Sequence, residues 1–556
     1  MFWLLLACDP LTLDAPAPVD SGGPEDSQPP EAIGGAKGKS ACSSLYQQDQ
    51  LMEFAVEMPD SSWDGLLADY AAGRKSYHPV SFSFEDETVD AQMRLKGNPN
   101  FSWLPTKMQF VISFNEDDDD ARFKGVRKIA LDHPWYESTL LRDRLAWWTL
   151  GQHKTLPTAC TNNATLTVNG ALYGLYASIE YYDREWVERN FGKSFADGTL
   201  WKYGTEPKTN TENADRDVVD TYLASYSLNQ LRGVGDLKQW MRGWAAELVV
   251  GSQDGYWCCA HNFYLYDHPE DGVVFVPWDM DITYDVMAYD TDPRQGYAVP
   301  PQFDIVVDDD PEGFLDALQE INDLVDVEET VATIDAWAEQ TEAAYLADPT
   351  RSTGVLEREQ QLERMRKWVP ARKGYLDSWI ACERGETTDA DGDGYSVCED
   401  PRDDDPGIHP GAQETCNGVD DDANGRIDDL AECDDCMRHD FEDLHLLYCT
   451  WPRTWAEAQA ECESRGGTLA TPNTTPGIYM TYLHTWQRGA QWWVGGTDQD
   501  KDGTWVQADG SPVEGYWASG EPNGGEAQNC AAWHTTENRW RSEDCEEAKA
   551  SVCVLP

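Results

Sequence analysis

Acidic and amide side chains recur in the segment 254–285, which reads DGYWCCAHNFYLYDHPEDGVVFVPWDMDITYD. Asp254 stands eight residues before Asn262, and a strand-like FYLY leads on to the acidic pair Asp279 and Asp281. Phosphoryl transfer needs such a set, because one carboxylate orients the attacking hydroxyl while an amide and another carboxylate hold the divalent metals on the phosphates. Ordinary protein kinases have a shorter interval between the first two residues, so an ordinary kinase is excluded.

The elements that must position these residues belong to a globular stretch, residues 46–383. Apolar alternation at MEFAVEM, MQFVISF and ATLTVNG predicts strands. Helical periodicity at STLLRDRLAWWTLGQH and KQWMRGWAAELVVGSQ predicts helices. The mixture predicts an α+β domain.

Several phrases of this stretch resemble the CotH kinase-like family, atypical kinases first recognised in spore-coat proteins. They are RLKGN, FKGVRKIALD, STLLRDRLAW, VNGALYGLYASIEYYD, LWKYG and the DGY…HNFYLY…VPWDMD run, in that order. The resemblance implies an atypical kinase-like fold that uses ATP with Mg²⁺ or Mn²⁺. It further implies Asp254 as the catalytic aspartate, Asn262 as its metal-binding companion, and Asp279 as the main metal ligand with Asp281 in support.

A kinase also needs a cation on the nucleotide phosphates and usually an acid that positions this cation. Lys107, in a predicted strand, and Glu180, in GLYASIE, are the first candidates for this pair. Lys96 and Lys202 are the alternatives for the cation, and the choice stays open.

Composition limits the partners and the compartment. The chain has 556 residues and a formal charge of -59, which repels nucleic acid and anionic membrane surfaces and favours cations as partners. Its 15 cysteines favour disulfides and an oxidising compartment. Cys258 and Cys259 lie inside the predicted catalytic loop, where a disulfide to Cys382 is one way to stiffen it. The partners of Cys42, Cys160 and Cys433 stay open.

The N-terminal residues favour export. Residues 1–8, MFWLLLAC, resemble the end of a bacterial lipoprotein signal with a lipid acceptor at Cys8. Residues 9–45 are rich in Pro, Gly, Ser and Asp, which predicts an unfolded tether. We therefore expect a protein on the bacterial outer surface or in the periplasm, with a lipid anchor as its only membrane contact.

Residues 386–433 form an acidic module in which oxygen ligands alternate with turn-forming glycines. This pattern is typical of a calcium loop, although the position-twelve glutamate of an EF-hand is absent. The module resembles the calcium-binding repeats of MopE and of thrombospondin type 3, and Cys398–Cys416 is a plausible disulfide. A plain solvated linker is the alternative. The expected calcium ligands are Asp389, Asp391, Asp393, Asp400, Asp420, Asp422, Asn424 and Asp428.

Residues 434–556 resemble a C-type lectin-like domain through TWAEAQAECESRGGTLATP, QWWVGGTDQDKDGTWVQADG and GEPNGG. Sugar binding in that family uses calcium held by an EPN triplet, of which Glu521 and Asn523 are present. Gln528 stands where a glutamate is expected, and Trp540-Arg541-Ser542 replaces the usual WND, which puts the calcium site in doubt. The resemblance also implies three disulfides: Cys462–Cys553, Cys530–Cys545 and Cys436–Cys449.

Two hypotheses of different classes follow from this multidomain organisation. In the first, an exported kinase phosphorylates Ser or Thr of a protein, and the lectin-like domain targets it. In the second, the chain is a calcium-dependent adhesin that recognises a cell-surface glycan or protein, and its kinase-like domain is a non-catalytic scaffold. A hydrolase lacks support, because the sequence contains neither GxSxG nor HExxH.

Overall fold

The protein is described from a computed structural model. It describes residues 40–99, 103, 107–134, 137–296, 298–351, 353–415, 419–423, 436–441, 444–471, 491–499, 503–507, 512–513, 517–523, 525–534 and 539–555.

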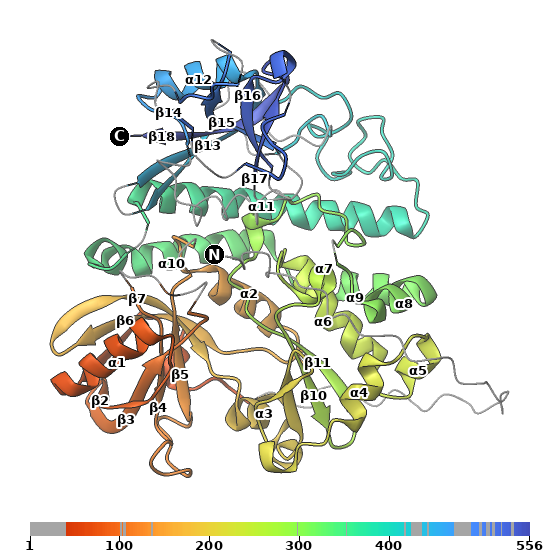
Figure 1. Cartoon of the computed structure of the whole chain (residues 1–556). Coiled ribbons are helices and arrows are strands. Elements are labelled where there is room, and N and C mark those ends of the chain that lie inside the picture. The colour runs from red at the N-terminus through yellow and green to blue at the C-terminus, as the bar shows by residue number, and fades with distance from the viewer. Residues whose placement is uncertain are drawn as a thin grey trace.

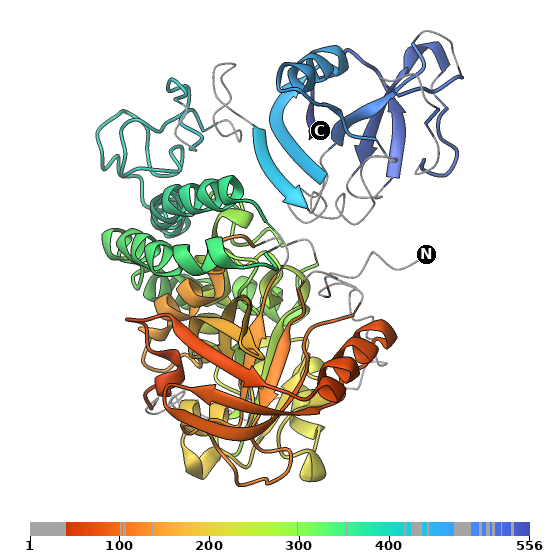
Figure 2. The same ribbon diagram turned by 90° about the vertical axis from the view of Figure 1, so that its left-hand side faces the viewer.

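A closed barrel forms the N-terminal part of the large domain, with the strand order β1-β2-β3-β4-β5-β7-β6 (Figures 1 and 2). β1 runs parallel to β6, whereas β1 and β2 pair antiparallel. Phe54, Phe82 and Phe110 are buried in its interior, and the alternating burial along β1 confirms the strand predicted at MEFAVEM. The strand bounds are β1 Met52–Glu57, β2 His78–Phe84, β3 Glu87–Leu95, β4 Phe110–Ser113, β5 Lys128–Asp132, β6 Thr161–Val168 and β7 Ala171–Glu180.

A second, open sheet has the order β11-β10-β8-β9 and carries the segment that leads to Asp279. Its buried side packs against helix α6, where Trp244 and Phe275 meet edge to face. The predicted helix at residues 138–153 begins only at Arg142, because Leu140 has a left-handed φ of 57°. The bounds are β8 Thr199–Lys202, β9 Glu206–Pro207, β10 Phe263–His268, β11 Gly272–Pro277, α1 Asp60–Ala72, α2 Arg142–Gly151, α3 Arg184–Phe191, α4 Asp217–Leu223, α5 Leu228–Arg232, α6 Leu237–Val249 and α7 Tyr256–Cys259.

A helical layer follows, in which α10 and α11 lie side by side across the large domain (Figure 1). Buried Leu362, Met365 and Val369 of α11 join the core shared by the second sheet and its helices. Of the helices in the described ranges, none combines the length and apolar character needed to cross a membrane. The bounds are α8 Pro301–Asp309, α9 Pro311–Asn322, α10 Val327–Ala347 and α11 Val355–Glu383.

The C-terminal domain is a mixed sheet with the order β12-β13-β18-β15-β16-β17, and β14 pairs with β18. Helix α12 covers it and begins in a capping box between Thr454 and Glu457. Buried Trp492, Trp533 and Trp540 form its core. The bounds are β12 Cys436–Phe441, β13 Leu444–Arg453, α12 Trp455–Ser464, β14 Thr468–Leu469, β15 Gln491–Thr497, β16 Cys530–His534, β17 Arg539–Glu543 and β18 Lys549–Leu555.

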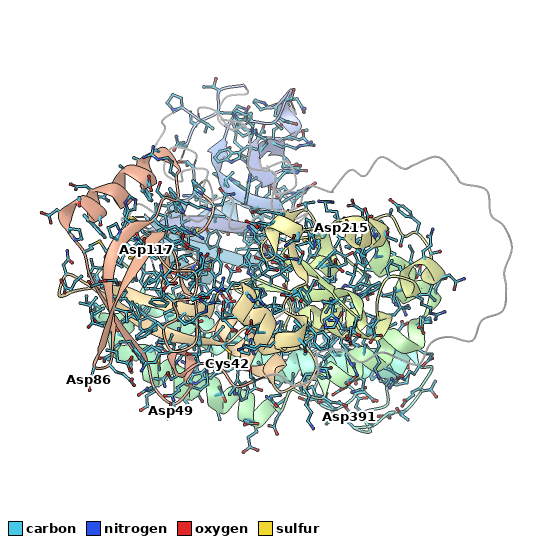
Figure 3. The ribbon with its side chains drawn as sticks, turned by 90° about the horizontal axis from the view of Figure 1, so that it is seen from below. Cys42, Asp49, Asp86, Asp117, Asp215 and Asp391 are labelled. Atoms are coloured by element: carbon cyan, nitrogen blue, oxygen red, sulfur yellow. A yellow bond between two sulfur atoms is a disulfide. The ribbon has the colours of Figure 1, made fainter. Side chains whose placement is uncertain are left out.

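The end of the expected tether is attached to the large domain. Cys42 is disulfide-bonded to Cys160, and the Ser40 N–H donates to the Arg189 carbonyl. Residues 40–45 therefore belong with the folded domain, because a covalent link and a backbone hydrogen bond both hold them. Figure 3 labels Cys42 together with acidic residues of separate elements that lie around the outside of the molecule: Asp49, Asp86, Asp117 and Asp215.

Candidate active site

Asp254 is the centre of a hydrogen-bonded group at the start of α7. Its Oδ1 lies 2.8 Å from His261 Nδ1, and its Oδ2 accepts a 2.8 Å hydrogen bond from Asn262 Nδ2. Ala260 and Asn262 both have left-handed φ values, 52° and 45°, so the chain turns sharply enough to return both side chains to Asp254. The structure thus brings Asp254 and Asn262 together, and it adds His261, which the sequence analysis did not select.

Glu247 of α6 supports this loop from inside the core. Its buried carboxylate accepts a 3.0 Å hydrogen bond from the Trp257 N–H. A Cβ at Gly255 would come within 2.7 Å of that carboxylate, so only glycine allows this close approach. Burial raises the pKa of Glu247 to about 8, although the backbone N–H groups of Trp257 and Tyr256 oppose the shift. No sequence pattern singled out Glu247, since its role depends on which loop packs against α6.

Asp279 follows β11 and faces the Asp254 group. The Trp278 N–H donates to the Asn262 carbonyl at 3.1 Å, which ties the two segments together. Asp279 has a left-handed φ of 62°, and the next N–H, of Met280, donates to Asp143 Oδ1 at 3.1 Å. Burial raises the pKa of Asp279, and the charge of Lys96 opposes the shift.

Carboxylates from separate elements surround Lys96 beside Asp279. Lys96 follows β3 and forms an ion pair with Asp132, which ends β5. Burial would lower the pKa of Lys96, but the charges of Asp132, Asp279 and Asp281 raise it. Burial also raises the pKa of Asp143, and the charges of Asp279 and Asp132 add to the effect. Carboxylate oxygens are the ligands that a hard divalent cation such as Mg²⁺ prefers.

Basic side chains gather at the same place, although the chain as a whole is strongly acidic. Lys202 Nζ lies 3.8 Å from the Trp278 ring centroid, and burial lowers its pKa to about 8 against the opposing charge of Asp279. Burial also lowers the pKa of Lys75, with the positive charges of Arg94, Lys96 and Lys208 adding to the shift. Clustered cations next to carboxylates are what a polyphosphate with its metal requires.

Lys107 and Glu180, the first candidates for the paired cation and acid, are not joined to each other. Lys107 is buried in an ion pair with Asp348, and its Nζ also donates to the Leu175 carbonyl at 2.7 Å. Glu180 pairs instead with buried Arg189 at 2.6 Å. The alternatives, Lys96 and Lys202, lie close enough to Asp279 for its negative charge to act on the pKa of each.

The cysteine pairing differs from expectation at one position. Cys398 is bonded to Cys382, so the expected Cys398–Cys416 pair is wrong, and a link from Cys382 to the catalytic loop is also wrong. The reason is that the acidic module folds back on the end of α11. The sulfurs of the loop cysteines Cys258 and Cys259 lie 2.9 Å apart. Cys416 and Cys433 are outside the described residues, as is Cys8.

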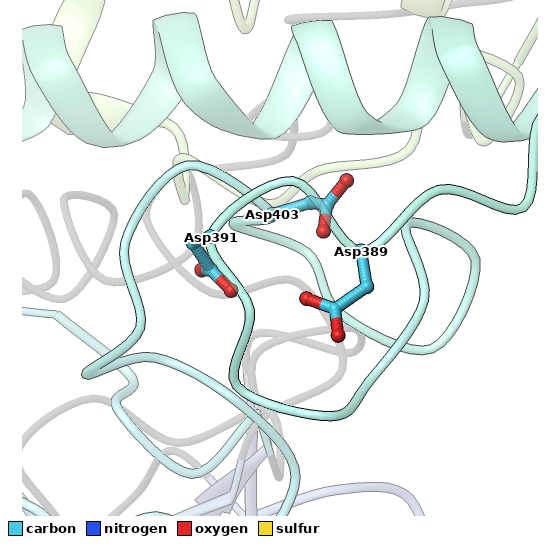
Figure 4. A group of neighbouring side chains, drawn as sticks. All are labelled: Asp389, Asp391 and Asp403. Carbon is cyan, nitrogen blue, oxygen red and sulfur yellow. The ribbon is translucent and has the colours of Figure 1, made fainter.

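The acidic module brings predicted calcium ligands together. Ligand oxygens within 4.8 Å of one another come from Asp389, Asp391 and Asp403, which Figure 4 shows as neighbouring side chains. Oxygens of Asp391 also lie this close to those of Asp393 and Asp400. A further group consists of Glu414, Asp420 and Asp422. Asp403 and Glu414 were not selected from the repeat pattern, and Asn424 and Asp428 lie outside the described residues.

In the C-terminal domain, Glu521 is engaged by neighbours. Its Oε2 accepts hydrogen bonds from the Ser542 hydroxyl at 2.8 Å and the Ser542 N–H at 3.3 Å, and its Oε1 accepts from Asn523 Nδ2 at 2.9 Å. A calcium ion at Glu521 and Asn523 would have to displace these bonds. The three disulfides that the resemblance implied are confirmed: Cys462–Cys553, Cys530–Cys545 and Cys436–Cys449.

Comparison with known proteins identifies both domains. The model of the CotH kinase protein family matches residues 93–376, and that of the lectin C-type domain matches residues 452–555. Tetranectin of Mus musculus is 32% identical over 116 residues, which cover 19% of this chain and 57% of tetranectin. Lectin BRA-3 of Megabalanus rosa is 28% identical over 118 residues, covering 20% of this chain and 72% of that lectin.

Among solved structures, the mouse scavenger receptor C-type lectin carbohydrate-recognition domain is 24% identical, with a TM-score of 0.20. The match covers 21% of this chain and 91% of that domain. The chain thus spans 57% of the length of tetranectin, and only through its C-terminal domain. Its disulfides and its lectin domain are consistent with an extracellular protein. Since the first family model covers more than half of its residues, the chain belongs to the CotH kinase protein family, with a C-type lectin domain near its C-terminal end.

Proposed function

We propose that the protein is an exported kinase that transfers the γ-phosphate of ATP to a Ser or Thr hydroxyl of a protein. The observation that carries this proposal is that Asp279 lies beside the hydrogen-bonded pair of Asp254 and Asn262, with the cations Lys96 and Lys202 next to it. Geometry supports the phosphate-binding role of these two lysines better than that of Lys107, whose buried ammonium is already bound to Asp348 and to the Leu175 carbonyl.

In this proposal each residue has one task. Asp254 orients the acceptor hydroxyl and takes its proton as the new O–P bond forms and the bond to the leaving ADP oxygen breaks. Asp279, with Asn262 and Asp281, would hold Mg²⁺ or Mn²⁺, since their side chains supply the oxygen ligands that these ions prefer. The metal, when bound, neutralises phosphate charge. His261 holds Asp254 in place through the 2.8 Å contact.

The experiment uses the full chain, disulfides intact, with γ-labelled ATP and Mg²⁺ or Mn²⁺. Asp279→Asn should weaken nucleotide binding at least about tenfold, because the variant loses a charged metal ligand. Asn is chosen because it tolerates the left-handed φ of 62° at this position. Asp254→Asn should keep nucleotide binding and lose at least about a hundredfold in labelling of the chain or of a Ser-rich basic peptide.

Asp335→Asn is the matched control, because it removes an exposed carboxylate of α10 that pairs with Arg366 at 2.7 Å and lies outside the Asp254–Asp279 group. Melting temperatures of the variants show whether they fold. Unchanged nucleotide binding in folded Asp279→Asn, or equal labelling in Asp254→Asn and the control, would contradict the kinase proposal.

A second candidate function is recognition by the lectin domain of a glycan or a protein on a cell surface. The internal hydrogen bonds of Glu521 favour a binding mode that does not use calcium at this position. Binding of the full chain to a glycan array should then survive a calcium chelator and the Glu521→Gln substitution. Loss of binding in both cases would indicate the calcium-dependent mode. In this reading the kinase-like domain is a scaffold, and Asp279→Asn has no effect on attachment.

We also propose that the acidic module binds Ca²⁺. Asp400 is 1% exposed and Glu414 is 4% exposed, yet Asp400 Oδ2 and Glu414 Oε2 have no hydrogen-bond partner among the residues that the structure describes. A buried carboxylate oxygen without a partner is costly unless a cation satisfies it. Isothermal titration with CaCl₂ should show binding that Asp400→Asn weakens.

A lipid anchor at Cys8 and a bacterial surface location are further predictions. Mass spectrometry of the exported protein would detect the lipid.

A further inference from the structure

One face of α11 is built to receive the acidic module. Gly374, Ser378 and Cys382 are spaced four residues apart, so they lie on the same side of the helix. Cys382 is bonded to Cys398, and the Ser378 hydroxyl oxygen accepts a 3.1 Å hydrogen bond from the Asp403 N–H. This stripe fixes the position of the module along the helix.

The lack of a side chain at Gly374 allows the module to come close to α11. A Cβ at this position would lie 2.3 Å from Arg402 Nε and 2.7 Å from Asp404 Oδ1. Glycine inside a helix is less favourable than alanine. The docked Arg402, which is buried and donates to Asp404 at 2.8 Å, is a physical reason for a glycine there.

The other end of the module contacts the segment that follows Asp279. The Tyr289 hydroxyl donates to the Asp420 carbonyl at 3.4 Å, and Val419 packs against the main core. Arg372 of α11 donates to the Tyr289 carbonyl at 2.7 Å and to the Thr291 carbonyl at 2.8 Å. The module, α11 and the segment around Tyr289 therefore form one connected group.

Contacts from α11 continue back toward the active site. Trp368 Nε1 donates to the Met287 carbonyl at 2.6 Å, and Arg364 pairs with Asp285 at 3.0 Å. Asp285 also pairs with buried Arg142 at 3.0 Å. The chain from Asp285 to Tyr289 is thus held along its length by the helix on which the module docks.

Two of the three carboxylate groups found in the described residues each contain one residue that also holds the module to the large domain. Asp403 belongs to the group with Asp389 and Asp391, and its N–H bonds to α11. Asp420 belongs to the group with Glu414, and its carbonyl accepts from Tyr289. Without a cation the carboxylates of each group repel one another, and this repulsion acts directly on the two docking residues.

We infer that Ca²⁺ in these two groups holds the acidic module against α11 and Tyr289, so that the module braces the kinase-like domain instead of separating it from the lectin domain. The inference rests on the calcium binding proposed above. Removal of Ca²⁺ leaves the Cys382–Cys398 link but releases the loop from α11, and residues 285–291 then open more often.

The test measures hydrogen–deuterium exchange in the full chain with CaCl₂ and with a chelator, alongside calcium titration. Calcium should slow exchange of residues 285–291 at least about tenfold, because local opening becomes rarer. Gly374→Leu should retain calcium binding and lose most of this protection, since it displaces Arg402 without changing a calcium ligand. Glu363→Leu, at an α11 side chain that is 54% exposed, is the matched control and should behave like the natural chain.

The outcomes separate the two proposals. In one outcome calcium slows exchange in residues 389–422 alone, and Gly374→Leu and Glu363→Leu give the same exchange. This outcome would contradict the inference that the module supports the kinase-like domain, but not the proposed calcium binding. No heat of calcium binding in the natural chain would overturn both. Protection of residues 285–291 that is lost in Gly374→Leu alone would support the brace.

Discussion

At the scale of single residues, the contact between Asp254 and His261 should make the stability of the protein depend on pH. Burial alone would lower the pKa of His261, but the hydrogen bond and the charge of Asp254, followed by the charge of Asp279, raise it above its ordinary value. The His261 imidazole on one oxygen and the Asn262 amide on the other hold Asp254 in a fixed orientation.

We predict that Asp254→Asn lowers the pKa of His261, as measured by NMR titration of its ring protons. Because the folded-state pKa is raised, the stability from the pair is fully present below about pH 6.5 and is lost as the pH rises through the raised value. The loss of unfolding free energy in Asp254→Asn should therefore be larger at pH 5.5 than at pH 9. His268, whose pKa burial lowers, is the internal control. A pH-independent loss would contradict the prediction.

At the scale of elements, helix α6 determines where the second sheet can lie. Gly243 faces β11, and a Cβ there would come within 2.3 Å of Phe275 Cδ1. The same helix carries Glu247, which supports the catalytic loop. Close packing of α6 on β11 therefore sets the distance between the loop of Asp254 and the residue that follows the sheet, Asp279.

We predict that Gly243→Ala destabilises the protein by about 1–3 kcal/mol, because an added methyl overpacks a dense core. Gly151→Ala is the matched control, since its Cβ would meet nothing within 4 Å at the exposed end of α2. The control should be neutral or slightly stabilising through helix propensity. Urea unfolding of both variants measures the effect, and equal midpoints would show that α6 can shift away from β11.

At the scale of the whole molecule, net charge opposes compaction. The chain has 101 acidic and 42 basic residues. Some acids form buried pairs, such as Asp348 with Lys107, but many lie exposed on separate elements (Figure 3). Like charges on a folded surface repel one another more strongly than those in an expanded chain.

We predict that the melting temperature rises with NaCl at constant calcium, because the screening length falls from roughly 30 Å at 0.01 M to roughly 3 Å at 1 M. Choline chloride at the same ionic strength should give the same rise, which separates screening from sodium binding. A melting temperature that falls with salt would indicate that attractive ion pairs outweigh the repulsion.

The sequence by itself determined the local features of this protein. The order of short motifs identified the kinase-like and lectin domains, apolar alternation located β1, and the resemblance to C-type lectin-like domains implied three disulfides that the structure contains. These inferences succeed because strand periodicity depends on neighbours in the chain. The disulfides followed from the resemblance, since domains that share the family motifs share the pairing of their cysteines.

Only the tertiary structure decided which groups meet. Lys96 and Asp132 lie at the ends of β3 and β5, and the register of the barrel brings both to Asp279, whereas Lys107 points to Asp348. Cys398 bonds Cys382 because the acidic module folds back on α11. Burial and partner choice depend on contacts between distant segments, and the spacing of residues along the chain does not encode those contacts locally.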